Sequence, residues 1–256
     1  PDRGLKELVR LIQDSGWKTK SGNKEVPGIA PEHYPEATKE MISKCAVCDT
    51  GGYLFPLGES TQNLKGALKR DSCFEVGWLI SEHRGVVDFT QHAAYHETQE
   101  HNLFVQNIRS GIYAGVLRID LDRIGYNDWW WLHSNSNPQK YSINNGDRAQ
   151  RAKALLEAIE QYLLSLGGAK QAGWLQHPSG LLEGVTVTSG SGPAPFVSPI
   201  KLSFSNGTSA IERNSGYIQK LKDLKGKKSG IELYEFLTMA EFADKMGTLR
   251  DSLQLS

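Results

Sequence analysis

The sequence predicts an α+β fold of ferredoxin-like type, and three observations support this class. One long amphipathic helix, over 147–166, is flanked by segments rich in β-forming residues. Several of these segments are short and resemble antiparallel strands, and long polar segments separate them. The order therefore differs from the regular alternation of strands and helices that builds a doubly wound parallel sheet.

The central helix is predicted from the spacing of its apolar residues, which place one face in the interior. Asp147 and Gln150 read as a capping box at its start, and Gly167 and Gly168 end it, because a left-handed cap costs glycine little. The loop that follows, 167–171, brings bare backbone and one lysine close to a polyanion. The apolar residues are Ala152, Leu155, Leu156, Ile159, Leu163 and Leu166.

The remaining elements follow from local periodicity and turn residues. Short helices are predicted over 5–13, 35–44, 212–225 and 231–246. Strands are predicted over 72–80, 108–119, 173–175, 184–188 and 201–204, of which 108–119 is the strongest. Three segments show no period and are predicted to be loops or insertions: 17–35, 84–102 and 132–146.

Composition limits the classes of function. Lys+Arg and Asp+Glu are both 29, and this balance counts against a protein that coats nucleic acid through net charge, though not against a local basic groove. No apolar run approaches the roughly 20 residues that cross a bilayer. We therefore expect a cytoplasmic protein without membrane contact.

The cysteines leave two interpretations open. Cys45 and Cys48 form a Cys-x-x-Cys pair, and with Cys73 and a histidine they could bind zinc, which takes four nitrogen or sulfur ligands. A single pair of this kind also occurs among ordinary core cysteines, and three cysteines do not indicate a disulfide framework. We expect no resident cofactor, with zinc as the alternative.

Basic residues in two segments predict a groove for a phosphate backbone. If 64–70 is helical, Lys65 and Lys69 share a side, and Arg70 lies next to them. Lys170 and Gln171 of the 167–171 loop could line the same groove.

Two further features leave alternatives open. Arg148 and Arg151 begin the central helix, where a cation is unfavourable against the helix dipole, so either a nearby anion or solvent exposure must offset the cost. The triplet Trp129–Trp131 is either a platform for stacked bases or part of the core.

Four sequence segments together identify a family resemblance. They are KRDSCF (69–74), IYAGVLRIDLDRIG (112–125), RAQRAKALLEAI (148–159) and GGAKQ (167–171). In this order and spacing they resemble the DevR-type backbone subunits of type I CRISPR Cascade complexes, which belong to the repeat-associated mysterious protein superfamily. The resemblance covers roughly 45–205. Relatives often carry an Asp-containing Gly/Phe turn where this chain has 49–55, which favours the core interpretation of the cysteines.

The resemblance implies a fold and a function. The fold would be a modified RNA-recognition palm, one domain over 1–256, with thumb and web excursions inserted at 17–35, 84–102 and 132–146. The subunit would be non-catalytic and would polymerise along CRISPR RNA, a thumb hairpin displacing bases at intervals. Its partners would be the CRISPR RNA, the target DNA strand, neighbouring copies of itself and other Cascade subunits. The RNA-binding residues would be Lys65, Lys69, Arg70, Gly167, Gly168, Ala169, Lys170 and Gln171.

Two other functions remain as alternatives. Type III relatives cut target RNA with an acidic residue near the thumb, and Asp88 or Glu97 could play that part in a metal-dependent ribonuclease. A small-molecule enzyme on an unrelated scaffold would instead be a monomer indifferent to RNA and to salt.

Overall fold

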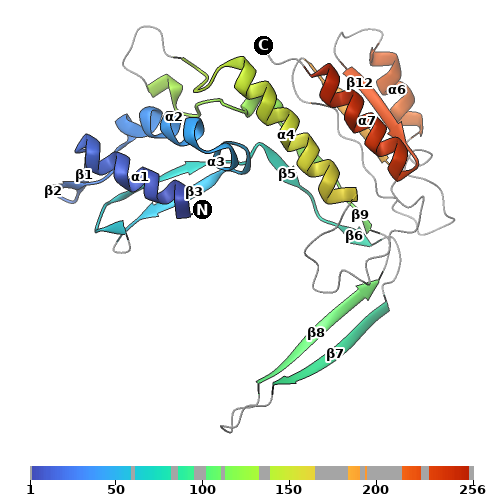
Figure 1. The fold of residues 1–256 in the computed structure, drawn as a ribbon, viewed down its shortest axis with the longest axis horizontal. Helices are drawn as coiled ribbons and strands as arrows, with labels where there is room; N and C mark the ends of the chain where they lie inside the picture. The colour runs from blue at the N-terminus through green and yellow to red at the C-terminus, as the bar shows by residue number, and fades with distance from the viewer. Residues whose placement is uncertain are drawn as a thin grey trace. The chain divides into compact units, whose positions relative to one another are not determined.

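The structure is a computed structural model, and in the part of the chain that it describes the fold is α+β, as predicted (Figure 1). It combines helices with two-stranded sheets, and no four-stranded palm is present among the described residues. The chain divides into two compact units: Pro1–Glu75, Arg118–Gly168 and Met246–Ser256 form the first, and Val76–Leu117 and Ala169–Lys245 form the second. The described residues are 2–58, 61–81, 86–94, 102–110, 113–132, 139–164, 184–190, 194, 215–225 and 231–253.

The first unit begins with a confirmed helix and a hairpin that the sequence did not predict. Helix α1 spans Asp2–Ser15 and buries Leu8 and Ile12. The prediction of a loop over 17–35 is wrong, because strands β1 (Lys18–Ser21) and β2 (Lys24–Pro27) pair antiparallel within this segment. Both strands lie mostly in solvent, so they carry no hydrophobic alternation from which to predict them.

A second hairpin carries the basic segment of the predicted groove. Strands β3 (Tyr53–Leu57) and β4 (Gly66–Arg70) pair antiparallel, with Tyr53 opposite Arg70. The helical interpretation of 64–70 is therefore wrong. In a strand successive side chains point to opposite faces, and here Leu68 and Arg70 are buried while Lys69 is exposed.

Helices α2 (Tyr34–Lys44) and α3 (Ala46–Gly51) precede this hairpin. Helix α2 confirms the helix predicted over 35–44, whereas α3 was not predicted. A one-turn helix, η1 (Pro31–His33), leads into α2. The main core of the unit gathers residues from α1, α2, α3, β3 and β4. Its buried members are Leu8, Ile12, Trp17, Ile29, Ala37, Met41, Cys48, Phe55, Leu64 and Leu68.

The two long strands predicted over 72–80 and 108–119 are each broken into shorter pieces. Strand β5 (Phe74–Val76) pairs with β10 (Leu117–Ile119), and β6 (Ile80–Ser81) pairs with β9 (Tyr113–Ala114). A Cβ on Gly115 would lie 2.6 Å from Leu79 Cδ2. Strand β9 ends just before this glycine, where the backbone passes close to the Leu79 side chain.

A long hairpin occupies most of the segment 84–102, in which the sequence shows no helical or strand periodicity. Strands β7 (Val86–Ala94) and β8 (Asn102–Ser110) pair antiparallel over nine residue pairs, from Val86 opposite Ser110 to Ala94 opposite Asn102 (Figure 1). The prediction that 84–102 lacks regular structure is therefore wrong for the strand residues. At about 3.4 Å per residue each strand extends roughly 30 Å.

The central helix, α4, spans Asn145–Leu164 and buries Ala152 and Leu156, as predicted. Its cap lies earlier than expected: the side chain of Asn144 accepts the backbone N–H of Asp147 at 2.9 Å and donates to the Asp147 carboxylate at 2.8 Å. Asn144 rather than Asp147 is thus the capping residue. Two one-turn helices precede α4: η3 (Leu121–Arg123) and η4 (Trp130–Leu132).

The C-terminal elements confirm one predicted strand and correct one predicted helix. Strand β11 (Gly184–Ser189) pairs with β12 (Ile231–Phe236). Helix α6 (Ser215–Lys225) lies within the helix predicted over 212–225, and α7 (Met239–Ser252) overlaps the end of the helix predicted over 231–246. The residues 231–236 were predicted to be helical. Pairing with β11 stabilises the strand instead, since β propensity depends on such partners. The segments 173–175 and 201–204 lie outside the described residues.

Candidate nucleic-acid interface and its buried anchor

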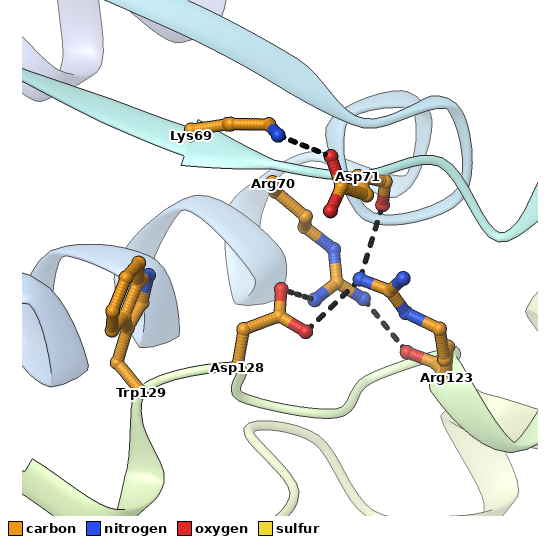
Figure 2. A pocket seen from close by; sticks show the side chains of 6 residues that line it. All are labelled: Lys69, Arg70, Asp71, Arg123, Asp128 and Trp129. Atoms are coloured by element: carbon orange, nitrogen blue, oxygen red, sulfur yellow. Dashed lines mark hydrogen bonds and ion pairs between the residues drawn. The ribbon is translucent and has the colours of Figure 1, made fainter.

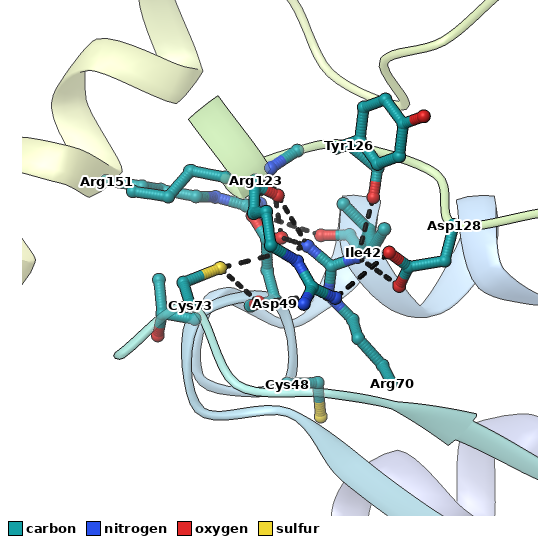
Figure 3. Close-up of polar contacts among 12 residues, drawn as sticks. Ile42, Cys48, Asp49, Arg70, Cys73, Arg123, Tyr126, Asp128 and Arg151 are labelled. Carbon is teal, nitrogen blue, oxygen red and sulfur yellow. Dashed lines mark hydrogen bonds and ion pairs between the residues drawn. The ribbon is translucent and has the colours of Figure 1, made fainter. Parts of the chain in front are cut away.

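A buried carboxylate joins the elements of the first unit. Asp49, in α3, has no exposed surface. One oxygen lies 2.7 Å from Arg70 Nη2 and the other 2.8 Å from Arg151 Nη1, and the backbone N–H of Gly125 donates to both oxygens at 3.0 Å (Figure 3). Two cations and an amide therefore compensate the cost of burying this charge.

Gly125 approaches the carboxylate in a backbone conformation that suits glycine. Its φ is +77°, and an added Cβ would lie 2.7 Å from Ile143 Cγ1 and 2.9 Å from Arg148 Cγ. No other residue fits this position without displacing its neighbours.

Arg70, predicted to bind RNA, is instead the main partner of Asp49. Its side chain is 0% exposed, and its donors reach the Asp49 carboxylate, the Asp128 carboxylate at 2.9 Å, and backbone carbonyls of Asp49, Arg123 and Tyr126 (Figure 3). A guanidinium offers five N–H donors in a planar fork, and these contacts engage them. Arg70 therefore organises the interior, and in this conformation it presents no surface to a phosphate.

The two cations that begin α4 have different neighbours. Arg151 binds the Asp49 carboxylate and the carbonyl of Ile42 at 2.7 Å, so the anion that its position predicts is a buried side chain of the same chain. Arg148 is fully buried; its guanidinium lies 3.6 Å from the ring centroid of Tyr141 and donates to the carbonyl of Ile124. Solvent exposure explains neither residue.

A surface pocket of about 360 Å³ lies beside this network. Figure 2 shows charged side chains of both signs around it. Arg123 pairs with Asp128 at 3.0 Å, and Lys69 pairs with Asp71 at 2.8 Å. The lining residues are Lys69, Arg70, Asp71, Arg123, Asp128 and Trp129.

The predicted lysines Lys65 and Lys69 are both exposed. The backbone of Lys65 is fixed, because its N–H donates to Pro27 and its carbonyl accepts from Ile29, while its side chain reaches solvent. Lys69 lies in β4, whereas Lys65 precedes the strand and is followed by Gly66, whose φ is +112°, so the shared helix side predicted for the two lysines does not exist. The hydrogen bond from Lys69 lowers the pKa of the Asp71 carboxyl below its ordinary value.

The other half of the predicted groove cannot be compared with these lysines. Gly167, Gly168, Ala169, Lys170 and Gln171 lie outside the described residues. Of the predicted residues that the structure describes, Lys69 and Arg70 lie in β4, with Arg70 on the buried side, and Lys65 immediately precedes the strand.

The three cysteines do not share one site. The backbone N–H of Cys48 donates to Cys45 Sγ at 3.2 Å, and the Cys73 thiol donates to the carbonyl of Asp49 at 3.3 Å. Figure 3 shows the Cys73 sulfur directed toward the charged network and the Cys48 sulfur directed away from it. Among the described residues no group of three His, Cys, Asp or Glu side chains is placed to hold a metal ion.

Burial raises the pKa of the Cys48 thiol to about 12 and that of the Cys73 thiol to about 11. Without a bound metal ion, both thiols are therefore protonated at neutral pH.

Other sequence candidates take separate positions. Asp88 lies in β7 opposite Ile108, and Glu97 lies outside the described residues. Trp129 packs against Tyr34 with ring centroids 5.0 Å apart, whereas Trp131 is 60% exposed. The tryptophan triplet thus divides between the interior and the surface.

Sequence reasoning missed the central role of Asp49 and the contribution of Asp128. Asp49 is 21 residues from Arg70 and 102 from Arg151, so no local pattern connects them. The one available signal was the pair of cations at the start of α4, which left a nearby anion and solvent exposure as the two alternatives.

Comparison with known protein families identifies the class of protein. Residues 4–209 match the family described as CRISPR-associated negative auto-regulator DevR/Csa2. Because the match covers most of the chain, the protein belongs to this family of CRISPR-associated proteins. A search of curated proteins found no match. No helix in the described part of the chain is long and apolar enough to span a membrane.

Proposed function

We propose that this chain is a non-catalytic backbone subunit of a CRISPR surveillance complex and that it binds CRISPR RNA. The membership of the DevR/Csa2 family over 4–209 is the observation that carries the proposal. The modified RNA-recognition palm that the resemblance implies would be built on the first unit. Its RNA contacts would be Lys65 and Lys69, whose side chains are exposed, together with the 167–171 loop.

These contacts suit a protein that accepts any spacer sequence. Lysine binds a phosphate as a point charge, and backbone contacts carry no information about sequence. Base pairing between the RNA and the target DNA strand would then supply the specificity. The formal charge of zero is compatible with this arrangement, since a local basic strip needs no net positive charge.

The β7–β8 hairpin is the element that we assign to the thumb. It lies in the segment where the resemblance implies such an excursion, and its nine paired residues make it the longest strand pair in the described part of the chain. A two-stranded hairpin of this length is marginal alone and is stabilised by a partner surface. RNA and a neighbouring copy would provide that surface.

Apolar side chains exposed near β5, β6, β9 and β10 support association with neighbouring copies or other Cascade subunits. Their exposed fractions run from 38% at Leu117 to 90% at Trp78, and apolar residues exposed together in this way mark interaction surfaces. The set is Val76, Trp78, Leu79, Ile80, Tyr113 and Leu117.

The proposal is tested by expressing the chain with a CRISPR RNA and measuring absorbance ratio and particle mass across a salt series. We expect RNA of spacer length in an oligomer, with binding that weakens as salt increases. Combined Lys65→Glu and Lys69→Glu should reduce RNA binding at least tenfold. Combined Lys18→Glu and Lys20→Glu, on exposed β1, makes the same charge change elsewhere and should have a smaller effect.

A monomer that remains free of nucleic acid at low salt would contradict the proposal. Equal losses in the Lys65/Lys69 variant and the Lys18/Lys20 control would instead show that RNA responds to overall charge, and the assigned contacts would then be wrong.

A further inference from the structure

The pair Cys45 and Cys48 has an arrangement that the proposed function does not use. Cys45 occupies the N-cap position of α3 and is partly exposed, while Cys48 lies one turn later and is 7% exposed. The backbone N–H of Cys48 donates to Cys45 Sγ at 3.2 Å, so the Cys45 sulfur lies against the backbone of Cys48. The fold therefore holds one reachable sulfur against one sheltered sulfur.

The surroundings explain why the second sulfur is sheltered. Cys48 belongs to the main core, and its Sγ lies 3.0 Å from the position that a Cβ on Gly4 would occupy, beside the ring of Phe55. An external reagent reaches Cys45 first. Cys48 is reached through Cys45, because the two sulfurs are neighbours and the other sides of Cys48 are packed.

We propose that Cys45 and Cys48 form a reversible intramolecular disulfide by exchange with a low-molecular-weight disulfide. In the first step the Cys45 thiolate attacks the external disulfide, forms a mixed disulfide and releases one thiol. In the second step the Cys48 sulfur attacks the Cys45 sulfur, closes the Cys45–Cys48 bond and releases the second thiol, which takes the Cys48 proton. Two electrons and two protons pass from the protein to the reagent, which is reduced to two thiols.

The alternative is that both residues are ordinary core cysteines without a redox role. It explains Cys48, which packs in the core, but not the partly exposed Cys45 held against it at the N-cap. Cys73 provides the internal comparison: it is 2% exposed, its thiol donates to the carbonyl of Asp49, and no second cysteine contacts it among the described residues.

The pair directly precedes the buried network in the sequence, and we expect its oxidation to leave that network unchanged. Asp49 follows Cys48 directly and is fixed by Arg70 and Arg151. A bond between residues already in contact across one turn leaves Asp49 in place, so we expect the oxidised chain to keep its fold. Its circular dichroism spectrum should match that of the reduced chain.

The experiment incubates the full chain with oxidised glutathione, denatures it and counts the thiols that N-ethylmaleimide modifies. The chain has three cysteines, so we expect modified thiols to fall from three to one, and dithiothreitol to restore three. Peptide mapping should recover a Cys45–Cys48 linkage with the loss of two hydrogen atoms. Persistence of all three thiols, or glutathione retained on Cys45, would overturn the proposal.

Three variants separate the steps. Cys48→Ser should stop the reaction at a mixed disulfide on Cys45, Cys45→Ser should leave Cys48 unmodified, and Cys73→Ala should oxidise as the parent does. Peptide mapping of the unaltered chain decides the matter even where a variant folds poorly. None of these measurements uses RNA, so their outcome is independent of the proposed function.

Discussion

Lys69, Arg70 and Asp71 are consecutive residues, yet they belong to two charged regions with opposite properties. Arg70 lies inside, where it joins Asp49 and Asp128 with its side chain 0% exposed. Lys69 and Asp71 pair with each other outside, each with a side chain 63% exposed. The alternation of side chains in an extended chain produces this division. Burial, rather than charge or position in the sequence, decides which cation stabilises the interior and which lies at the surface, where a ligand can approach it.

The largest effect should come from removing the charge at the centre of the interior region. Asp49→Asn leaves the buried Arg70 and Arg151 guanidinium groups without their shared carboxylate, and we expect the free energy of unfolding to fall by about 3–5 kcal/mol. Urea denaturation measures it. Asp71→Asn is the matched surface change and should cost less than about 1 kcal/mol. Equal losses in the two variants would show that burial does not separate the regions.

A smaller loss should follow when the interior charge is kept and its geometry is changed. Arg70→Lys retains the cation but has three donors where the guanidinium has five, so carbonyls of Tyr126 and Arg123 lose their partner. We expect a loss of about 2–3 kcal/mol in the free energy of unfolding. Arg123→Lys, at a partly exposed pair, is the control and should change the same quantity by less than about 1 kcal/mol. If Arg70→Lys left the free energy of unfolding unchanged, a positive charge at this position would be sufficient for stability.

The smallest effect concerns the acid titration of the surface pair. The hydrogen bond from Lys69 lowers the pKa of Asp71 below its ordinary value of 3.8. A lowered pKa in the folded state means that the pair stabilises the fold above the unfolded pKa, and that this contribution is lost as the pH falls through the folded pKa. Because the pair is exposed, solvent screening makes the change in stability small.

The carboxyl signal of Asp71 in an NMR titration measures this pKa directly. We expect Lys69→Met to raise it toward the ordinary value, while Lys65→Met leaves it unchanged. A pKa that does not respond to Lys69→Met would show that the ion pair is absent in solution.

Sequence reasoning performed best where a single element buries one face. The apolar spacing in α4 predicted that Ala152 and Leu156 are buried, and the structure confirms both. It performed worst where pairing decides the outcome. The residues 231–236 form a strand because β11 pairs with them. The β1–β2 hairpin buries so few side chains that its sequence shows no alternation of apolar and polar residues.

The candidate site shows the same division. Lys65 and Lys69 were found because lysines are recognisable as solvent-facing cations, and both are exposed. Arg70 was grouped with them by composition, and only the strand geometry and the distant carboxylates of Asp49 and Asp128 separate it. Gly125, whose N–H completes the Asp49 site, follows a short one-turn helix and gave no sign of this role.

The sequence by itself determined the α+β class, the family and the buried face of α4, because these depend on periodicity and motifs within short stretches of chain. The tertiary structure decided which charged residues are partners. Asp49 meets Arg70 and Arg151 across 21 and 102 residues of sequence. Such pairings are set by how α3, β4 and α4 pack together, and the cost of burying a charge makes them obligatory once that packing has formed.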